Sequence, residues 1–394
     1  MTPPSRPGTS IQFDEHSLAT LMHKLQVRRE TERRIAAEPA WATPVPMEVG
    51  LQLTYRCNLR CIHCYQWNDE GLFRPLSAEQ VQRELPLEII EKVLVETAPA
   101  RSKLYLWGGE PLMHSRFDEL AALVAREGRA VNLCTNGLLV DRHLDALRSL
   151  GEGLVLFVSM DGLEPQHDRI RGRGTFARTA EQLDRVLVEQ RAGRFAGEVT
   201  LSCMVADPTI GHLYEFAGWA EQRGVGSVYF QFPWYVGPET RRAMDAVWAE
   251  RFSWLGPLEN GTGSWHSYSH RIDPALLPAL REDMSRVASR KWGMRIRYQP
   301  ETAGDELDDF VAGGARPAEG RTMCLAIANR LEVLADGQVT ACKFFPEFVI
   351  GDLRQSSVSE LWHGERFRKV RSVMRELGLM PICSKCTLLY QNGA

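Results

Sequence analysis

The sequence predicts an α/β protein in which an open, partial (β/α)6 barrel of the TIM type is followed by a small C-terminal α+β domain. Three observations lead to this fold class. Short β-like runs alternate with helical patterns between residues 47 and 235, the intervening segments are each long enough for one helix, and a hairpin signal appears only after residue 320. Alternation of this kind is typical of βα units that build a parallel sheet.

Six runs are the predicted parallel strands, and each is rich in branched or aromatic residues: 47–53, 103–107, 130–134, 154–160, 198–205 and 227–232. Ser77 and Gln80 form a capping-box pattern that predicts the start of the first helix. Gly128 and Gly224 stand where later helices are expected to end. With one helix after each strand, six units make an open barrel rather than a closed one.

The chain divides into four predicted segments. Residues 1–46 form a lead-in that begins rich in Pro, Ser and Gly and continues as a weakly amphipathic helix, and residues 47–235 form the barrel. Residues 236–320 lose the alternation, which indicates an insertion or linker region. Residues 321–394 form the second domain, because Asp336-Gly337 between two β-like runs predicts a hairpin and an amphipathic helical stretch follows.

Composition limits the classes of function. Hydrophobic residues make up 44% and charged residues 25% of the 394 residues, the balance of an ordinary globular protein. The formal net charge is -3 and the basic residues are scattered, so we expect no nucleic-acid partner. No run reaches the roughly 18 apolar residues of a membrane span, and the N-terminus lacks a signal-peptide pattern. We therefore expect a cytoplasmic protein with no membrane partner.

Seven of the nine cysteines fall into two groups with short internal spacings. In a reducing compartment such spacings indicate metal ligation rather than disulfides. The first group, Cys57, Cys61 and Cys64, follows the first predicted strand with the spacing CxxxCxxC. Three thiolates can hold three corners of a cubane cluster and leave the fourth iron open to a small chelating molecule. Zinc would need a fourth protein ligand, which His63 could supply only with awkward geometry.

The CxxxCxxC spacing after one strand, together with Gly108-Gly109-Glu110-Pro111 after the next, resembles the radical S-adenosylmethionine (SAM) superfamily. The resemblance implies that the open iron of a [4Fe-4S] cluster binds the amino and carboxylate groups of SAM. It also implies that an electron from the cluster breaks a carbon–sulfur bond of SAM and releases a 5′-deoxyadenosyl radical. Gly108, Gly109 and Glu110 are then expected to hold the SAM amino group.

Two further motifs extend the resemblance: residues 135–137 (TNG) follow the third predicted strand and residues 159–162 (SMDG) follow the fourth. By resemblance Asn136 belongs to the cofactor site, Ser159 contacts the SAM ribose and Arg171 contacts the SAM carboxylate. The alternative is that the polar residues of these motifs are only turn-forming residues beside glycines. These motifs follow the ends of predicted parallel strands, where a barrel places its active site.

The second group consists of four cysteines near the C-terminus: Cys324, Cys342, Cys383 and Cys386. Four thiolates can saturate a [4Fe-4S] cluster or bind one zinc ion. Their context resembles the C-terminal SPASM/twitch region of radical SAM enzymes, which implies an auxiliary [4Fe-4S] cluster. The full SPASM pattern has three further cysteines that are missing here, so we expect one auxiliary cluster. Because four thiolates leave no open iron, we expect it to transfer electrons.

Cys134 and Cys203 lie inside predicted strands and belong to neither group. A free cysteine in such a place is usually a small apolar core residue. Leu201 and Val205, at alternating positions around Cys203, favour this interpretation. The alternative is that Cys203 gives a hydrogen atom to a substrate radical, as an epimerase requires.

The resemblance implies an enzyme that begins by abstracting a hydrogen atom from its substrate. We predict the crosslinking or epimerisation of a ribosomally made peptide in natural-product biosynthesis, with a separate leader-peptide-binding protein as partner because residues 1–46 are too short for such a module. The first alternative is a dehydrogenase of a small molecule such as an aminocyclitol or sugar. The second is a non-catalytic electron carrier or a zinc-stabilised scaffold. Either enzyme needs a reductant such as flavodoxin or ferredoxin.

Overall fold

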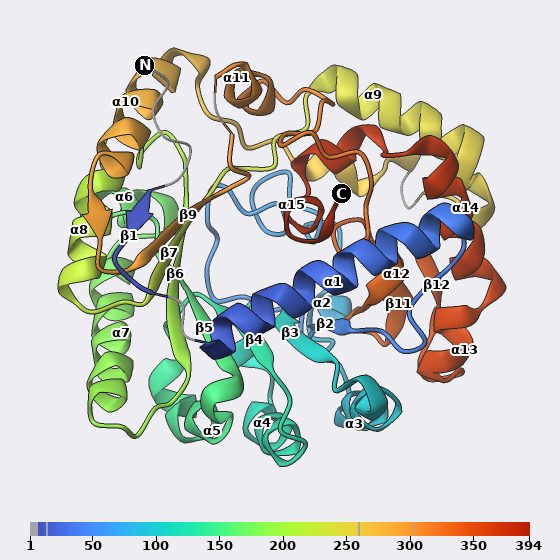
Figure 1. Cartoon of the computed structure of the whole chain (residues 1–394), viewed down its shortest axis with the longest axis horizontal. Helices are drawn as coiled ribbons and strands as arrows, with labels where there is room; N and C mark the ends of the chain where they lie inside the picture. Colours follow the sequence, from blue (N-terminus) through green and yellow to red (C-terminus); the bar gives the residue numbers. More distant parts are fainter. Residues whose placement is uncertain (1–6, 13–14, 259–260, 303) are drawn as a thin grey trace.

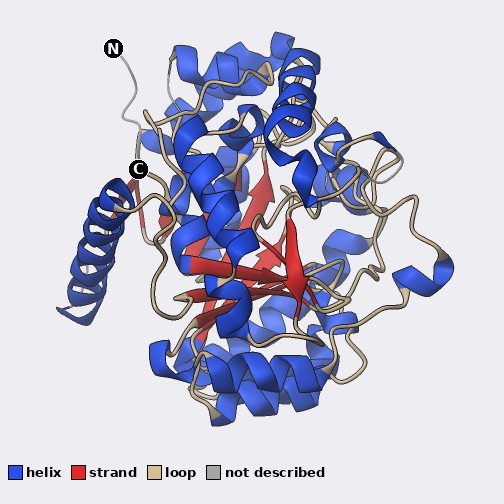
Figure 2. Ribbon diagram, turned by 90° about the vertical axis from the view of Figure 1, so that its right-hand side faces the viewer, coloured by secondary structure: helices blue, strands red, loops and turns tan. Residues whose placement is uncertain are grey.

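The computed structural model describes residues 7–12, 15–258, 261–302 and 304–394, so the first six residues of the predicted lead-in lie outside it. Its centre is a 10-stranded sheet with the order β12-β11-β10-β2-β3-β4-β5-β6-β7-β9. Helices lie around this curved sheet, which Figure 1 shows from the front and Figure 2 from the side. The predicted α/β class and the open, partial barrel are confirmed.

Six consecutive parallel strands form the middle of the sheet, and each coincides with a predicted run to within about two residues. They are β2 (Glu48–Gln52), β3 (Lys103–Trp107), β4 (Val131–Thr135), β5 (Leu154–Ser159), β6 (Glu198–Met204) and β7 (Ser227–Gln231). Alternate residues of β4 and β5 are fully buried, whereas those between them are only partly buried. One face of the sheet therefore packs against helices, and the other faces the inside of the barrel.

The connecting helices cover the outer face of the sheet (Figure 1). They are α2 (Ala78–Val81), α3 (Leu87–Glu96), α4 (Phe117–Arg126), α5 (Leu144–Ser149), α6 (Glu164–Arg171), α7 (Thr175–Arg191) and α8 (Leu213–Gln222). The capping box predicted at Ser77 and Gln80 is formed at the start of α2. Gly128 and Gly224 have φ angles of 56° and 80° after α4 and α8, so the predicted helix ends are confirmed as well.

Residues 236–320, predicted as an insertion or linker, contribute a seventh parallel strand. This strand, β9 (Arg295–Gln299), pairs with β7 at the edge of the barrel. The same stretch contains α9 (Pro238–Val247), α10 (Leu277–Ala288), α11 (Asp305–Val311) and the short β8 (Lys291–Trp292), which pairs with β1 (Gly8–Thr9). The sequence of β9, RIRYQ, is apolar at only two positions, so its pattern is too short to be distinguished from a loop.

The C-terminal region contains the predicted hairpin, formed by β10 (Arg330–Val333) and β11 (Gln338–Thr340), with Gly337 at a φ of 84° between them. β10 also pairs in parallel with β2, so the barrel sheet continues into this region. The remaining elements are β12 (Val349–Asp352), α12 (Ala326–Asn329), α13 (Val358–His363), α14 (Glu365–Leu377) and α15 (Thr387–Asn392). The domain boundaries stay predictions, but strand pairing joins the barrel to the region after it.

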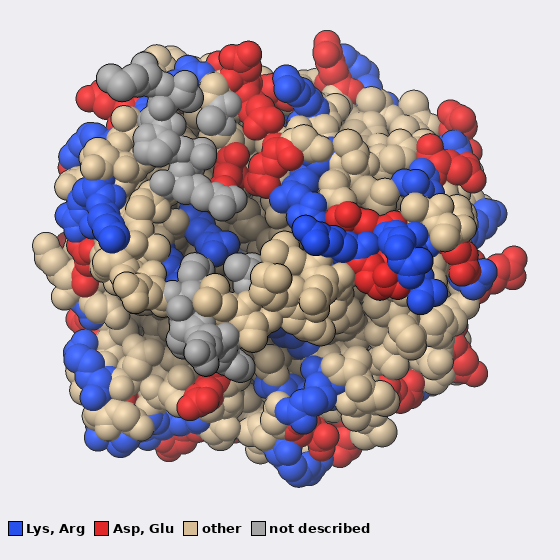
Figure 3. All heavy atoms as spheres, viewed as in Figure 1, with Lys and Arg blue, Asp and Glu red and all other residues tan. Residues whose placement is uncertain are grey.

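Helix α1 (Glu15–Ala37) lies along the outside of the molecule (Figure 1). Within the described ranges, no helix combines the length and the apolar character that crossing a membrane would require. On the face that Figure 3 shows, acidic and basic side chains are interspersed rather than gathered by sign.

Candidate functional site

A cavity of about 290 Å³ lies at the carboxyl ends of the parallel strands. This volume is close to the lower end of the range in which proteins bind small molecules. Strand residues that point to the inside of the barrel form its floor: Tyr105, Trp107, Asn132, Cys134, Phe157, Ser159, Ser202, Met204, Tyr229, Gln231 and Gln299. The loops after the strands form its rim, as a (β/α) barrel requires of an active site.

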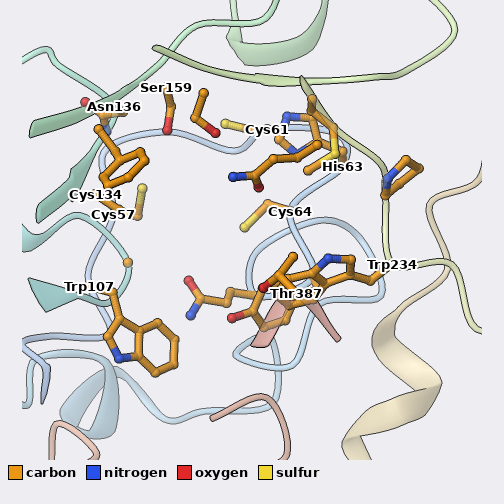
Figure 4. Close-up of a pocket in the computed structure, with 18 of the residues that line it drawn as sticks. Cys57, Cys61, His63, Cys64, Trp107, Cys134, Asn136, Ser159, Trp234 and Thr387 are labelled. Carbon is orange, nitrogen blue, oxygen red and sulfur yellow. The ribbon is translucent and has the colours of Figure 1, made fainter. Parts of the chain in front are cut away.

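The first cysteine group lies on this rim. Cys57, Cys61 and Cys64 come from the loop after β2 and all three line the cavity, and Figure 4 shows them with the polar residues at the ends of the next strands. Burial raises the pKa of Cys57 to about 12 and that of Cys61 to about 11. These three neutral thiols share one cavity, and no fourth protein ligand stands with them in the described chain. Once deprotonated, such a donor set fits a metal group that binds three thiolates and leaves one coordination position open.

Two glycines fix the position of the cysteine loop against β3. Gly109 and Glu110 donate their backbone N–H groups to the carbonyl oxygens of Thr54 and Arg56, at 2.8 and 2.7 Å. A Cβ at Gly109 would overlap the Arg56 carbonyl oxygen, and Gly108 has a φ of 154°. The N–H groups of Gly109 and Glu110 are therefore occupied within the protein and are not available to a ligand in the cavity.

Glu110 is 1% exposed and is held by three hydrogen bonds. Its Oε1 accepts from Thr135 Oγ1 at 2.7 Å and from the Leu112 N–H at 3.1 Å, and its Oε2 accepts from the Asn136 N–H at 2.7 Å. Burial raises the pKa of Glu110, and these hydrogen bonds partly oppose the rise. Since a carboxylate has about four lone-pair sites, one remains for a cationic group in the cavity.

Asp161 connects the cysteine loop to α6. Its Oδ2 lies 2.9 Å from His63 Nε2 and accepts from Arg171 Nε at 2.7 Å, and its Oδ1 accepts from the Met204 N–H at 2.8 Å. Burial alone would raise the pKa of Asp161, but the charges of Arg171 and His63 hold it well below its usual range. Arg171 also points Nη1 at Cys61 Sγ, 3.8 Å away, so His63 and Arg171 are oriented by one carboxylate beside the cysteines.

The second cysteine group shares a smaller cavity of about 40 Å³. It is lined by Cys324 before α12, Cys342 after β11, and Cys383 and Cys386 before α15. Burial raises the thiol pKa of all four, that of Cys386 to about 12, and the proximity of other cysteines in the group raises the pKa of Cys342, Cys383 and Cys386 further. Four thiols in one small apolar chamber fit a metal group that four thiolates saturate.

Neither group is arranged as a tight site for one ion. Among the residues that the structure describes, no three His, Cys, Asp or Glu side chains are close enough together to hold a single metal ion. The fit to iron–sulfur clusters rests on the thiol donors of each group and on the single cavity that the cysteines of each group line together.

The two remaining cysteines differ in position. Cys203 is fully buried in the core and does not line the cavity, whereas its neighbours Ser202 and Met204 do. This placement favours the predicted core packing over the alternative of hydrogen-atom transfer. Cys134 points the other way: it lines the cavity, and its Sγ lies 2.9 Å from the hydroxyl oxygen of Tyr105. Strand alternation could have distinguished the two, because Cys134 is an even number of residues from the cavity-facing Asn132.

The structure brings together all of the predicted SAM contacts: Gly108, Gly109, Glu110, Asn136, Ser159 and Arg171 line one cavity. Asn136 is held by its own contacts, since its Nδ2 donates to Asn58 Oδ1 at 2.7 Å. Many lining residues have no counterpart in the predicted site, and Trp107, His270 and Lys343 are three of them. Trp107 ends a predicted strand, but the other two come from loops whose positions the sequence does not fix.

Comparison with known families agrees with this geometry. Residues 51–190 match the model of the radical SAM superfamily, and residues 324–387 match the SPASM model, an iron–sulfur cluster-binding domain. The first match contains Cys57, Cys61 and Cys64, and the second contains the four later cysteines. A radical SAM domain implies SAM and a [4Fe-4S] cluster, and a SPASM domain implies auxiliary iron–sulfur binding.

Individual relatives are distant. The subtilosin biosynthesis protein AlbA of Bacillus subtilis, named for an antilisterial bacteriocin, is 26% identical over 194 residues, which cover 48% of this chain and 40% of AlbA. The chain thus spans less than half of that relative. The pre-heme d1 synthase of Dinoroseobacter shibae is 26% identical over 359 residues, 87% of this chain and 79% of that protein. Streptococcus suis SuiB, solved with its precursor peptide SuiA, shares the fold with a TM-score of 0.58 over 92% of this chain and 73% of SuiB, at 13% identity.

Proposed function

Because this chain belongs to the radical SAM superfamily and carries a SPASM domain, we propose that it is an enzyme that cleaves SAM reductively and abstracts a hydrogen atom from its substrate. One observation carries the proposal: the three cysteines of the first group and the motif residues Gly108 to Glu110 line a single cavity at the carboxyl edge of the sheet. A non-catalytic electron carrier or scaffold would have no use for such a cavity beside its cysteines.

Cys57, Cys61 and Cys64 would hold the SAM-binding [4Fe-4S] cluster. When bound, this cluster supplies the electron that breaks a carbon–sulfur bond of SAM to give the 5′-deoxyadenosyl radical. Glu110 would accept a hydrogen bond from the SAM ammonium at its remaining lone-pair site, beside the turn at Gly108.

The other proposed SAM contacts follow from the hydrogen-bonding groups that each residue does not already use within the protein. Arg171 uses Nε on Asp161, so its remaining N–H groups would bind the SAM carboxylate. The Ser159 hydroxyl, at the end of β5 and inside the cavity, would bind the ribose. Asn136 would support the site by donating its backbone N–H to Glu110.

The second cysteine group would hold one auxiliary [4Fe-4S] cluster. Four thiolates leave no iron open to substrate, which supports electron transfer as its role. Lys343 lines both cavities, so it forms part of the wall between the proposed substrate space and the auxiliary chamber. A flavodoxin or ferredoxin would supply the electron for SAM cleavage.

A ribosomally made peptide is the first proposed substrate class, modified by crosslinking or epimerisation. The similarity to AlbA, named for bacteriocin biosynthesis, supports it over 48% of this chain. A separate leader-peptide-binding protein would then be a partner. The second candidate is a dehydrogenase of a small molecule such as an aminocyclitol or sugar, and the similarity to pre-heme d1 synthase over 87% of this chain favours a small-molecule substrate.

Metal analysis with a SAM-cleavage assay tests the proposal. The protein would be purified and reconstituted without oxygen, analysed for iron, sulfide and zinc, and reduced with dithionite in the presence of SAM. Wild type should hold about eight irons and form 5′-deoxyadenosine, whereas the Cys57/Cys61/Cys64→Ala triple variant should hold about four and form none. A Cys203→Ala variant is the matched control, because that cysteine belongs to neither group.

Two results would contradict parts of the proposal. Wild type that carries both clusters and SAM but forms no 5′-deoxyadenosine would exclude the enzymatic role. About four irons with one zinc in wild type would make the second cysteine group structural and exclude its electron-transfer role.

A further inference from the structure

Two carboxamide side chains lie next to each other on the floor of the cavity. Gln231 at the end of β7 and Gln299 at the end of β9 are partners in the register of these strands, and both line the cavity. Neighbouring strands are about 4.8 Å apart, so the two amides are close enough to bind one chemical group together. Within the described chain they form no hydrogen bond with each other, which leaves both free to do so.

The backbone fixes the orientation of the Gln299 amide. Its Nε2 donates to the carbonyl oxygen of Thr387 at 3.4 Å. Since a carbonyl oxygen can only accept, the NH2 group of Gln299 must face it, and Oε1 is left as an acceptor. Across the described ranges no donor reaches this Oε1, and it is not sealed off from the cavity that the side chain lines. Gln299 therefore presents a hydrogen-bond acceptor to a ligand.

Gln231 is half-buried, and both polar atoms of its amide are free. No group of the described residues forms a hydrogen bond with its Oε1 or Nε2, and neither atom is closed off from the cavity. A free carboxamide can donate and accept at the same time. Gln231 beside Gln299 thus offers a ligand at least one donor and one acceptor.

The floor around this amide pair is uncharged and lies apart from the proposed SAM contacts. The neighbouring positions of β6 and β7 that line the cavity are Ser202, Met204 and Tyr229. Figure 4 shows Thr387 on the side of the cavity away from Asn136 and Ser159, two of the proposed SAM contacts. Because Gln299 donates to Thr387, the amide pair belongs to that side. A neutral group of the substrate fits there.

A carboxamide matches the pair in both donor and acceptor. Its N–H can donate to Gln299 Oε1, and its carbonyl oxygen can accept from Gln231 Nε2. An ionised carboxylate can only accept, so it would set a negative oxygen against the Gln299 oxygen. Amide side chains do not titrate near neutral pH, so this match depends on the charge state of no residue in the cavity.

We propose that Gln231 and Gln299 bind a carboxamide group of the substrate and so select a peptide-like substrate. The inference rests on the proposed function, because it names a feature of that enzyme's substrate. The carboxamide belongs either to the main chain of a peptide or to an Asn or Gln side chain. A site built to bind an N–H group discriminates strongly against an analogue that lacks it.

Four probes that share one phenylethyl group test the subsite. Calorimetric titration of the anaerobic, cluster-loaded protein with SAM present would compare N-methyl-3-phenylpropanamide, 3-phenylpropanamide, methyl 3-phenylpropanoate and 3-phenylpropanol. The ester keeps the carbonyl oxygen but has no N–H for Gln299. In wild type, at least one amide should bind about tenfold tighter than the ester and the alcohol. Tighter binding of the N-methyl amide assigns the group to a peptide main chain, and tighter binding of the primary amide assigns it to a side chain.

The two glutamines should respond differently. Gln299→Met removes the acceptor, so it should abolish the preference for the amide over the ester. Gln231→Met removes the donor to a carbonyl oxygen that both probes carry, so it should weaken amide and ester alike, by about threefold. The matched control is Gln190→Met: the Gln190 amide also donates to a backbone carbonyl, that of Gly197 at 2.7 Å, but does not line the cavity, so wild-type affinities are expected.

Four results would each overturn the inference: equal affinity for both amides and the ester in wild type, absence of amide binding in wild type, an alcohol that binds as tightly as the better amide, or a preference that survives Gln299→Met. The wild-type comparison alone is decisive if a variant fails to fold.

The binding test is independent of SAM cleavage. If wild type prefers an amide but forms no 5′-deoxyadenosine, the carboxamide subsite stands and the proposed enzymatic role fails. If it cleaves SAM but shows no preference for an amide, the proposed function stands and the subsite is wrong.

Discussion

The two cysteine groups present similar ligands in opposite settings. Cys57, Cys61 and Cys64 border a cavity of about 290 Å³ whose lining includes amides, hydroxyls and charged side chains. The four later cysteines border a chamber of about 40 Å³, lined mainly by apolar side chains. A metal group that exchanges a ligand needs room and polar contacts, whereas one that only passes electrons is better kept from water. The difference between the two settings supports a division of labour.

Both groups share one electrostatic property, which is that burial keeps their thiols neutral without metal. The pKa of Cys57 and that of Cys386 are both raised to about 12. Metal binding must therefore displace protons from both groups and compensate for burying the charge. We expect assembly of either cluster to stabilise the surrounding fold.

The largest expected difference between the two clusters is in their rates of iron loss, and equal rates would contradict the comparison. The first cluster faces the open cavity and the auxiliary cluster faces an apolar chamber, so a soluble iron chelator should remove the first about a hundredfold faster from oxidised, SAM-free protein. The measurement is the absorbance of the chelated iron with time, and two well-separated phases of about four irons each are expected.

Added SAM should slow the fast phase alone, since only the first site would bind it. A single phase for all the iron, or slowing of the second phase by SAM, would contradict the contrast between an open and an enclosed cluster.

The second prediction concerns how tightly the first cysteine loop is held. In Gly109→Ala, the new methyl group would overlap the carbonyl oxygen of Arg56 and push the loop away from β3, which should lower the free energy of unfolding by about 2 kcal/mol and reduce iron binding at the first site. Denaturant unfolding and iron analysis measure the two effects.

Gly218→Ala is the control for the same chemical change. Gly218 lies within α8, and a Cβ there has no neighbour within 4 Å, so this variant should be slightly more stable than wild type and bind iron normally. Normal iron content in Gly109→Ala would show that the close approach to Arg56 does not position the cysteines.

The sequence predicts the regular part of this molecule well. The six parallel strands are long enough to show their apolar pattern, and cysteine spacing places both ligand groups. It does not predict β9, whose short edge sequence carries three polar residues, or the pairing of β10 with β2, because pairing between distant strands is decided by packing.

The site shows the same limit. Motifs adjacent to strand ends identify Glu110 and Ser159, because the end of a parallel strand fixes where they point. Arg171, at the end of α6, is identified only by the family resemblance. Lys343 comes from a loop after an antiparallel hairpin, and only the folded chain shows that it reaches the barrel. The exact partners of Asp161, which joins His63 and Arg171, also depend on a packing arrangement that no local pattern encodes.

The third prediction concerns His270, a histidine that lines the cavity of the first cysteine group, and tests how well that cavity is hydrated. Burial, followed by the nearby His63, lowers the pKa of His270 from 6.5 to about 4. The unfolded chain then binds a proton below about pH 6.5 that the folded chain does not bind until about pH 4, so stability is full above pH 6.5 and falls as the pH drops. Between about pH 7.5 and pH 5.5, protonation of His270 in the unfolded chain should therefore lower the free energy of unfolding by about 1.5 kcal/mol.

Denaturant unfolding at several pH values checks this, and His270→Gln should have a shallower dependence than wild type. His212→Gln, which changes an exposed histidine outside the cavity, should keep the wild-type dependence. An unchanged slope in His270→Gln would mean that His270 is as well hydrated as in the unfolded chain.

The smallest expected effect is a difference in stability between variants of Cys134 and Cys203. These two cysteines belong to neither metal group and lie on opposite faces of the sheet. Cys203→Ser places a hydroxyl in the apolar core, whereas Cys134→Ser places one in the cavity beside the Tyr105 hydroxyl, where it can form a hydrogen bond. Cys203→Ser should therefore be less stable than Cys134→Ser by about 1 kcal/mol, as measured by denaturant unfolding. The reverse order would mean that Cys203 has access to polar surroundings, and the hydrogen-atom donor role would then have to be tested at Cys203 first.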